Sequence, residues 1–192
     1  MSTRVCNPFS ANREGINIGE GGALFVVSNE PKGAELCGVG EGSDAHHISA
    51  PDPSGQGACR SMSEALSDAG LNATDIGYVN LHGTATALND HMEAIAMHQV
   101  FGADTPCSST KPLTGHTLGA AGAIEAAICW LLTTSEDSVL PLHKWDGVQD
   151  SELPGINLVG VHNQSESPGK YVLSNSFAFG GNNISLIFGR VS

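Results

Sequence analysis

The chain has 192 residues, of which 40% are hydrophobic and 15% are charged, and its formal net charge is −12. This length can bury one good hydrophobic core, so we expect a single folded unit. The acidic charge excludes the basic footprint of a nucleic-acid-binding protein, and it also disfavours docking on an anionic membrane surface.

The first third of the sequence alternates apolar runs with glycine-rich turns. Residues 23–27 form a short apolar run behind a glycine cluster, which is typical of a buried strand. A second extended segment is expected over residues 33–42, and a polar loop follows it. The spacing of the next apolar residues predicts a helix over residues 56–69, which Gly70 ends as a C′ residue.

The middle of the chain contains a predicted strand and a predicted helix. The strand covers residues 76–81 and delivers His82 at its carboxyl end. The helix covers residues 89–101, with the asparagine at its start as the N-cap. Two acidic residues near that start, Asp90 and Glu93, favour this assignment because they oppose the positive end of the helix dipole.

The remaining elements complete an α/β pattern. Residues 106–111 form a short strand or extended link, and residues 119–133 form an alanine-rich helix that can approach its neighbours closely. Residues 140–155 are loop-like, and residues 170–175 and 183–188 alternate as two strands around a Phe-Gly turn. The order of the elements predicts a layered α/β fold with a mixed five-stranded sheet.

Two motifs of small residues each contain a histidine. They read His82-Gly83-Thr84-Ala85-Thr86 and Gly115-His116-Thr117-Leu118-Gly119-Ala120-Ala121-Gly122. His82 follows a predicted strand, and ligands bind at the carboxyl ends of strands in open α/β sheets. His116 precedes a predicted helix, whose N-terminus disfavours the imidazolium, so a neutral ring can donate an N–H to an oxyanion. We expect both rings to reach one carbonyl oxygen; the alternative is a satisfied core histidine beside turn-forming threonines.

Lys111 and Glu125 are two charged residues that stand out in the sequence, because the chain has few cations and the helix around Glu125 is apolar. The chain has only eight Lys and Arg residues, and Lys111 lies five residues before His116. Glu125 lies inside the most apolar predicted helix, and a buried carboxylate needs a partner, which Lys111 or a bound cation would supply. A purely structural ion pair and a catalytic one both fit this pattern.

A glycine-dense segment near the C-terminus is the third candidate element of a site. Phe177, Phe179 and Gly180 belong to this segment, which runs to Asn183. Its glycines allow positive φ, so it is either only a tight turn or a turn that presents a backbone N–H to an oxyanion beneath an aromatic side chain.

Other features of the sequence carry less information about chemistry. The five cysteines lack C-x-x-C spacing, which favours reduced, buried thiols in a cytoplasmic protein. The N-terminus has no apolar core of a signal peptide, and no apolar stretch is long enough to span a membrane. His46 and His47 lie in a polar loop without spaced partners, so we expect no metal site there.

The two histidine motifs, Lys111 and the segment from Asn175 to Gly181 together resemble the β-ketoacyl-[acyl carrier protein] synthases, condensing enzymes with the thiolase-like fold. The resemblance covers nearly the whole chain and matches the C-terminal half of that fold. Residues 107–111 and 180–183 are similar to the subgroup that makes aryl polyene pigments.

The resemblance assigns a role to each candidate residue. It implies that His82 and His116 hold a malonyl thioester carbonyl and stabilise the enolate left by decarboxylation. Lys111 resembles the lysine that supports the second histidine, and Glu125 the glutamate of its network. Phe179 resembles a gating phenylalanine whose backbone N–H joins the oxyanion hole, with Phe177 and Gly180 in the same loop. Thr84 and Thr86 resemble the threonines that hydrogen-bond the phosphopantetheine arm.

The resemblance also implies partners and an incomplete site. We expect residues 1–192 to be the C-terminal half of a ketosynthase domain, without the N-terminal half that carries the nucleophilic cysteine, and inactive alone. The implied partners are acyl carrier protein, malonyl and acyl thioesters, and a second subunit in a homodimer or heterodimer. No metal or bound cofactor is implied, because phosphopantetheine of the carrier protein holds the substrates.

Two other readings of the chain stay open at this stage. The parent protein is alternatively a chain-length-factor-like subunit, which pairs with an active synthase and lacks the cysteine. A thiolase-like acyltransferase or hydrolase with other acyl donors is the third reading. Retention of both histidines favours the synthase over these alternatives.

Overall fold

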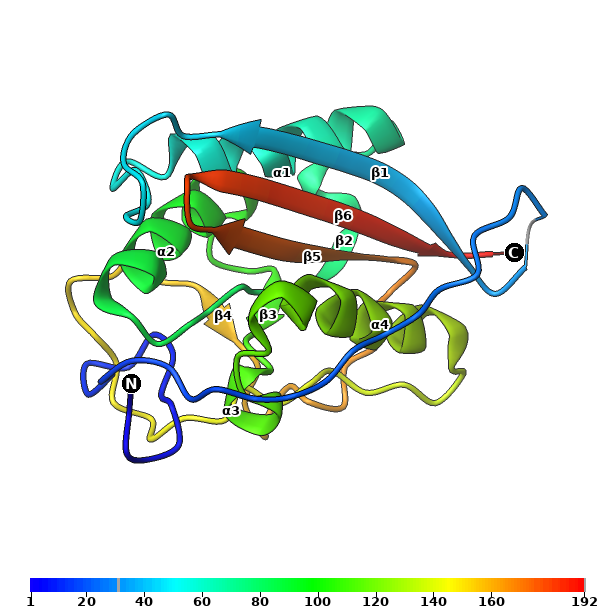
Figure 1. Cartoon of the computed structure of the whole chain (residues 1–192). Coiled ribbons are helices and arrows are strands. Elements are labelled where there is room, and N and C mark those ends of the chain that lie inside the picture. Colours follow the sequence, from blue (N-terminus) through cyan, green and yellow to red (C-terminus); the bar gives the residue numbers. More distant parts are fainter. Residues whose placement is uncertain (31, 192) are drawn as a thin grey trace.

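The computed structural model describes residues 1–30 and 32–191 and is built around one mixed β-sheet (Figure 1). The described part of the sheet has six strands in the order β1-β6-β5-β2-β3-β4. Their bounds are β1 Ala34–Ser43, β2 Ile76–Asn80, β3 Pro106–Ser108, β4 Asn157–Leu158, β5 Tyr171–Ala178 and β6 Asn182–Arg190. The predicted number of five strands is therefore wrong, although the predicted mixed α/β sheet is correct.

The sheet has an antiparallel half and a parallel half. β1 pairs with β6 and β6 with β5 in antiparallel register, whereas β2 runs parallel to both β5 and β3, and β3 runs parallel to β4. The carboxyl ends of β2, β3 and β5 therefore meet at the same edge of the sheet, where open α/β sheets bind ligands.

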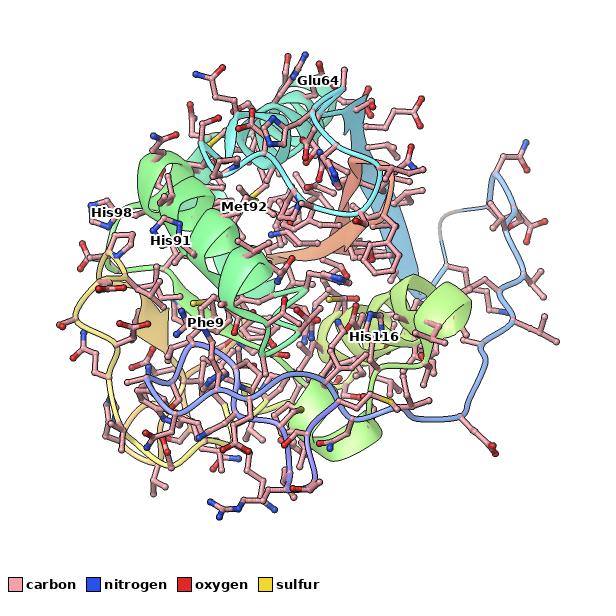
Figure 2. The ribbon with its side chains drawn as sticks, turned by 60° about the vertical axis from the view of Figure 1, so that its left-hand side comes forward. Phe9, Glu64, His91, Met92, His98 and His116 are labelled. Atoms are coloured by element: carbon pink, nitrogen blue, oxygen red, sulfur yellow. The ribbon has the colours of Figure 1, made fainter. Side chains whose placement is uncertain are left out.

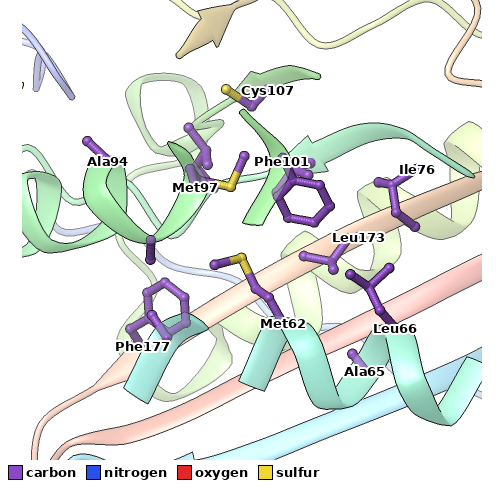
Figure 3. Packing of buried hydrophobic residues seen from close by; sticks show 14 of the residues in the cluster. Met62, Ala65, Leu66, Ile76, Ala94, Met97, Phe101, Cys107, Leu173 and Phe177 are labelled. Atoms are coloured by element: carbon purple, nitrogen blue, oxygen red, sulfur yellow. The ribbon is translucent and has the colours of Figure 1, made fainter. Parts of the chain in front are cut away.

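Helices cover both faces of the sheet. The α-helices are α1 Gln56–Ala69, α2 Ala87–Phe101, α3 Lys111–Thr114 and α4 Ala121–Thr134. α1 and α2 pack on one face and α4 packs on the other (Figure 1). Leu173 and Val172, neighbours on β5, point into these two separate cores, as the two-residue period of a strand requires. Figure 3 shows Met62 and Leu66 of α1 near Leu173 in the first core.

The three predicted helices are present, although α2 and α4 begin at other residues than predicted, and the short α3 begins where an extended segment was predicted to end. α1 has the predicted bounds, and Gly70 ends it with a φ of 66°. α2 begins earlier than predicted, because Thr86 and not Asn89 is its N-cap. Asn89 lies inside the helix and is buried, and its side-chain amide donates to Asp90 and Glu93.

The strands differ from the prediction in two places. Residues 23–27 belong to no described strand, and Leu24 and Val26 are fully exposed. This prediction was wrong because no neighbouring strand within the described chain receives the segment. β4 was not predicted, because its two residues are too few to show the two-residue period of a strand.

Among residues 1–30 and 32–191, no helix combines the length and the apolar composition that crossing a membrane requires.

Candidate active site

His82 lies at the carboxyl end of β2, where the strand turns into a loop over residues 82–86. Its side chain is 6% exposed. The Lys111 ammonium contacts it twice, because Nζ donates to the His82 carbonyl oxygen and lies 3.3 Å from Nδ1. An ammonium only donates hydrogen bonds, so Nδ1 must accept, and the ring proton of the neutral imidazole is on Nε2.

His116 is held in place by the N-terminal segment. Its backbone N–H donates to Asn17 O at 2.7 Å, and its carbonyl accepts from Gly19 N at 3.1 Å. The two backbones cross so closely that a Cβ on Gly19 would lie 2.2 Å from Thr114 O. The Leu118 N–H donates to Nδ1 of the His116 ring at 3.2 Å, so this neutral ring also carries its proton on Nε2.

The two histidine rings lie close together, as the resemblance implies. Their centroids are 5.4 Å apart and the ring planes are nearly perpendicular. Burial, the Lys111 charge and His116 lower the pKa of His82 well below its ordinary value. Burial and the Lys111 charge lower the pKa of His116 to about 4. Both rings are therefore neutral near pH 7, and each has one N–H available for an oxyanion.

Lys111 forms a buried ion pair with Glu125, and both side chains are 2% exposed. This pairing was predicted from the apolar surroundings of Glu125. Burial raises the pKa of Glu125, and the neighbouring ammonium opposes that rise. One oxygen, Oε1, accepts from Lys111, whereas Oε2 is buried without a hydrogen-bond partner.

The histidine that Lys111 supports differs from the prediction. The resemblance implies support of the second histidine, but the hydrogen bonds of Nζ run to His82 and Glu125. Lys111 begins α3 directly after β3, which lies beside β2 in the sheet. Its side chain therefore reaches the end of β2, where His82 lies.

The glycine-dense segment brings one of its two phenylalanines to the histidines. Phe177 is 6% exposed, and its ring centroid lies 6.0 Å from that of His82. The side chain of Phe179 is 82% exposed, in the turn between β5 and β6. Gly180 has a φ of 83° and donates its N–H to Ile48 O at 2.8 Å. The aromatic neighbour of His82 is therefore Phe177.

Comparison with known proteins places this site in a family. The family model for the β-ketoacyl synthase C-terminal domain matches residues 33–143, which include both histidines, Lys111 and Glu125. The chain belongs to the β-ketoacyl synthase family.

Several synthases are similar to this chain. The 3-oxoacyl-[acyl-carrier-protein] synthase 2 of Staphylococcus aureus (strain COL) is 38% identical over 96% of this chain and 46% of its own length. The enzyme of the same name from Coxiella burnetii is 36% identical over 98% of this chain and 47% of its own length. The chain thus spans about half the length of the curated relatives it matches.

A solved structure is similar over the whole chain. It is the complex of the ketosynthase ApeO with its chain length factor ApeC from Xenorhabdus doucetiae. The match has 48% identity and a TM-score of 0.89, and it covers 99% of this chain and 47% of that chain. This likeness supports the thiolase-like fold inferred from the motifs.

Thr84 and Thr86 lie in the loop after His82. Their hydroxyls hydrogen-bond each other at 2.8 Å, and Thr84 is 6% exposed. Thr86 is half-buried and is the N-cap of α2. The structure places both beside His82 in the chain, and their contact with a phosphopantetheine arm stays a prediction.

The five cysteines are all free, and none shows the features of an activated nucleophile. Burial raises the pKa of every thiol, in the half-buried Cys37 and Cys59 as well as in the buried Cys6, Cys107 and Cys129. A raised pKa favours the unreactive thiol over the thiolate. Within residues 1–30 and 32–191, no cluster of three His, Cys, Asp or Glu residues is placed to hold a metal ion.

Sequence reasoning missed three buried residues around the site. Asp90 and Glu93 were interpreted only as favourable charges at a helix start, yet both are fully buried. His143 is 2% exposed and links Ser109 N to Pro8 O through its two ring nitrogens. The burial of Asp90 and Glu93 could have been predicted as it was for Glu125, because each is a carboxylate within a helix that is apolar on several sides.

Proposed function

We propose that this chain is the C-terminal half of a 3-oxoacyl-[acyl-carrier-protein] synthase and that it stabilises the enolate formed when a malonyl thioester loses carbon dioxide. The observation that carries the proposal is the pair of neutral, converging rings of His82 and His116, each with its proton on Nε2. Preorganised N–H donors of this kind stabilise charge that develops on a carbonyl oxygen.

The proposed reaction assigns a separate task to each group. The malonyl thioester oxygen accepts hydrogen bonds from Nε2 of both histidines. The bond to the carboxylate breaks, carbon dioxide leaves, and the electron pair passes into the enolate. The enolate carbon then attacks an acyl thioester carbonyl, and the thiolate that held the acyl group is expelled. Lys111 fixes the Nδ1 side of His82 throughout, and Glu125 holds Lys111.

The acyl thioester in this scheme belongs to a cysteine of an N-terminal half. The outer side of α4 supports the need for such a half, because this helix is apolar nearly all round. A helix with that composition is ordinarily buried. Trp130 and Leu131 are nevertheless 40% and 53% exposed, and Leu24 and Val26 are fully exposed. We infer that the N-terminal half covers these apolar groups, in line with relatives about twice as long.

The substrates and partners follow from the same proposal. Acyl carrier protein delivers the malonyl and acyl groups on its phosphopantetheine arm. Thr84 and Thr86 hydrogen-bond this arm. The reaction takes place in the cytoplasm. Phe179 and Gly180 form a gate beside the two histidines, and Phe177 packs against His82 behind it. The parent pairs as a homodimer or with a second ketosynthase-like subunit. The 48% identity to the chain from the ApeO–ApeC complex favours the aryl polyene subgroup.

The test uses the complete protein encoded by the reading frame that contains this chain. We expect it to release carbon dioxide from malonyl-acyl carrier protein, and we expect His116→Ala to slow this release by about 10²–10³-fold, the effect of losing one oxyanion donor. Loading of the acyl group onto the cysteine should change little in that variant. Normal decarboxylation by His116→Ala would contradict the role of the histidine.

The partner-subunit reading makes a different prediction for the same experiment. The ApeO complex contains a chain length factor, so this reading has a specific observation in its favour. A parent without a cysteine at a strand-to-helix turn would neither load an acyl group nor complete a condensation. That result would make the parent a non-catalytic subunit.

A further inference from the structure

His143 is a buried residue whose ring joins two separate segments of the chain, and it is 2% exposed. The backbone N–H of Ser109, which follows β3, donates to Nδ1 at 3.1 Å, and Nε2 lies 3.0 Å from the carbonyl oxygen of Pro8. A backbone N–H only donates and a carbonyl oxygen only accepts, so the ring is neutral and carries its proton on Nε2. We call these two hydrogen bonds the His143 bridge.

The orientation of the ring is fixed by packing as well as by the two hydrogen bonds. Phe9 and Trp145 flank the ring, and their ring centroids lie 6.0 Å and 5.6 Å from that of His143. The His143 backbone N–H donates to Val159 O at 2.9 Å. Burial lowers the pKa of His143 to about 4, although the hydrogen bond to the Pro8 carbonyl opposes this shift. The ring is therefore neutral near pH 7, as the bridge requires.

One side of the bridge runs through Ser109 to the His82 loop (residues 82–86). The Ser109 hydroxyl donates to Gly83 O at 2.7 Å and accepts from Lys111 N at 3.3 Å. The serine and the loop are so close that a Cβ on Gly83 would lie 2.5 Å from Ser109 Cβ. Ser109 therefore connects His143 to the residue after His82, and also to the lysine whose ammonium contacts the His82 ring.

The other side of the bridge runs through Pro8 to the Phe9 turn (residues 8–9). Phe9 has a φ of 60°, in the left-handed region that costs a non-glycine residue free energy, so this turn depends on contacts that hold it. The Phe9 ring also reaches the His82 loop, because a Cβ on Gly83 would lie 3.0 Å from Phe9 Cε2. Both sides of the bridge therefore end on Gly83, next to His82.

We propose that His143 is a positioning residue, whose ring holds Ser109 and the Phe9 turn together and so fixes Gly83 and the direction of the His82 ring. The bridge itself rests on the hydrogen bonds, whereas its consequence for decarboxylation rests on the proposed function. His143 does not touch the reacting atoms, because Ser109 and Pro8 occupy its two nitrogens. A neutral imidazole suits this task, since it offers one acceptor and one donor on a rigid ring.

The first test detects the bridge in the wild-type chain by NMR. We expect the ¹⁵N shifts of a ring that is protonated on Nε2, and a scalar coupling between Ser109 N and His143 Nδ1 across their hydrogen bond. The separation of 3.1 Å is that of an ordinary hydrogen bond. A ring protonated on Nδ1 near pH 7, or no coupling between these two nitrogens, would overturn the proposal.

The second test removes one side of the bridge at a time. In His143→Asn the side-chain oxygen lies near the position of Nδ1, so it still accepts from Ser109, but the side chain is too short to reach Pro8. In His143→Gln the side-chain nitrogen lies near the position of Nε2, so it still donates to Pro8 O, and the Ser109 N–H loses its acceptor. His98→Gln is the control, since His98 is exposed on α2, well apart from His116 (Figure 2).

The loss of the Ser109 contact is expected to have the larger effect, because Ser109 hydrogen-bonds Gly83 and Lys111, whereas Phe9 reaches Gly83 by packing. His143→Gln should speed hydrogen exchange of the Ser109 amide by about tenfold, the effect of one lost hydrogen bond, and should shift the His82 ring signals. His143→Asn should keep the Ser109 amide protected and shift the His82 signals less. His98→Gln should change neither.

The complete protein shows whether this difference reaches the chemistry. His143→Gln should lower kcat for decarboxylation of malonyl-acyl carrier protein by about tenfold with little change in KM, because a misdirected N–H donor weakens binding of the transition state more than of the substrate. His143→Asn should retain most of the rate. A purely structural role would affect the two variants alike, since each loses one buried hydrogen bond.

The outcomes separate this proposal from the proposed function. Unchanged His82 ring signals in both His143 variants, or equal shifts in the two, would overturn the positioning role. If His143→Gln does not fold, Ser109→Ala replaces it, because it removes the hydroxyl contacts with Gly83 and Lys111; unchanged His82 signals there would also overturn the proposal. If the NMR results hold but the complete wild-type protein does not decarboxylate malonyl-acyl carrier protein, the proposed function fails and the bridge remains.

Discussion

The histidine site and the segment over residues 23–27 differ in how much of their environment this chain supplies. His82 has its backbone N–H, carbonyl and Nδ1 all hydrogen-bonded within the chain, and Lys111 beneath it uses all its donors. In the 23–27 segment, Leu24 and Val26 are fully exposed. The chain therefore fixes the two histidines through its own contacts, whereas it leaves apolar side chains exposed that, in the proposed function, an N-terminal half covers.

The largest effect is expected at the buried ion pair. Lys111→Met leaves the Glu125 carboxylate without its partner, which typically costs about 3–5 kcal/mol when a buried pair is broken. Urea unfolding of the chain measures this loss as a lower free energy of unfolding. The double variant Lys111→Met, Glu125→Leu should recover most of it, because an apolar pair needs no charge compensation. A single variant as stable as the wild type would mean that the pair contributes no support to the site.

A matched pair of leucine substitutions compares the two regions directly. Leu173 is fully buried on β5, so Leu173→Ala should lower the free energy of unfolding by about 2–5 kcal/mol. Leu24→Ala makes the same chemical change at a fully exposed site, and should stay within about 0.5 kcal/mol of wild type. Urea unfolding tests both variants. A large loss for Leu24→Ala would show that the segment is already covered in the isolated chain.

The protonation of His116 is expected to change only in acid. Its folded pKa is lowered to about 4, so the folded state binds its proton later than the unfolded chain does. The stability that the neutral ring contributes is therefore complete above about pH 6.5 and is lost as pH falls toward about 4. Imidazole ¹⁵N NMR should show the Nε2–H form at neutral pH, with the urea-unfolded chain as control. A charged His116 ring at pH 6 in the folded chain would contradict this geometry.

The smallest effect on stability is expected from a charge on the exposed segment. Val26→Asp should change the free energy of unfolding by less than about 0.5 kcal/mol and should reduce self-association of the isolated chain, which sedimentation measures. Val161→Asp is the control, because Val161 is 83% exposed outside the segment. Equal association of the two variants would show that residues 23–27 are not the apolar surface that needs a cover.

The sequence predicts those features well that depend on residues close together in the chain or on the cost of burying a charge. α1 and Gly70 follow directly from apolar spacing and a left-handed glycine. The Lys111–Glu125 pair follows from the cost of burying a carboxylate alone. The convergence of the two histidines depends instead on a long-range bridge between Ile18 and His116, which no local pattern encodes.

Two predictions from the sequence were wrong or incomplete because they depend on contacts with residues far away in the chain. Residues 23–27 have the composition of a buried strand, but burial needs a neighbour that the described chain lacks. Asp90 and Glu93 match the preference for acids at a helix start, although they accept four backbone hydrogen bonds from the Phe9 turn and the His82 loop. Acidic residues are favoured both at the start of a helix and as acceptors for buried backbone amides. The sequence pattern alone therefore does not show which of the two roles Asp90 and Glu93 have.

The most direct test of the central claim is a crystal structure of the complete protein with a malonyl thioester analogue that cannot lose carbon dioxide. We expect the thioester oxygen to lie within about 3 Å of Nε2 of both His82 and His116. An oxygen bound to only one of the rings, or to neither, would contradict the claim that the two histidines form a single oxyanion site.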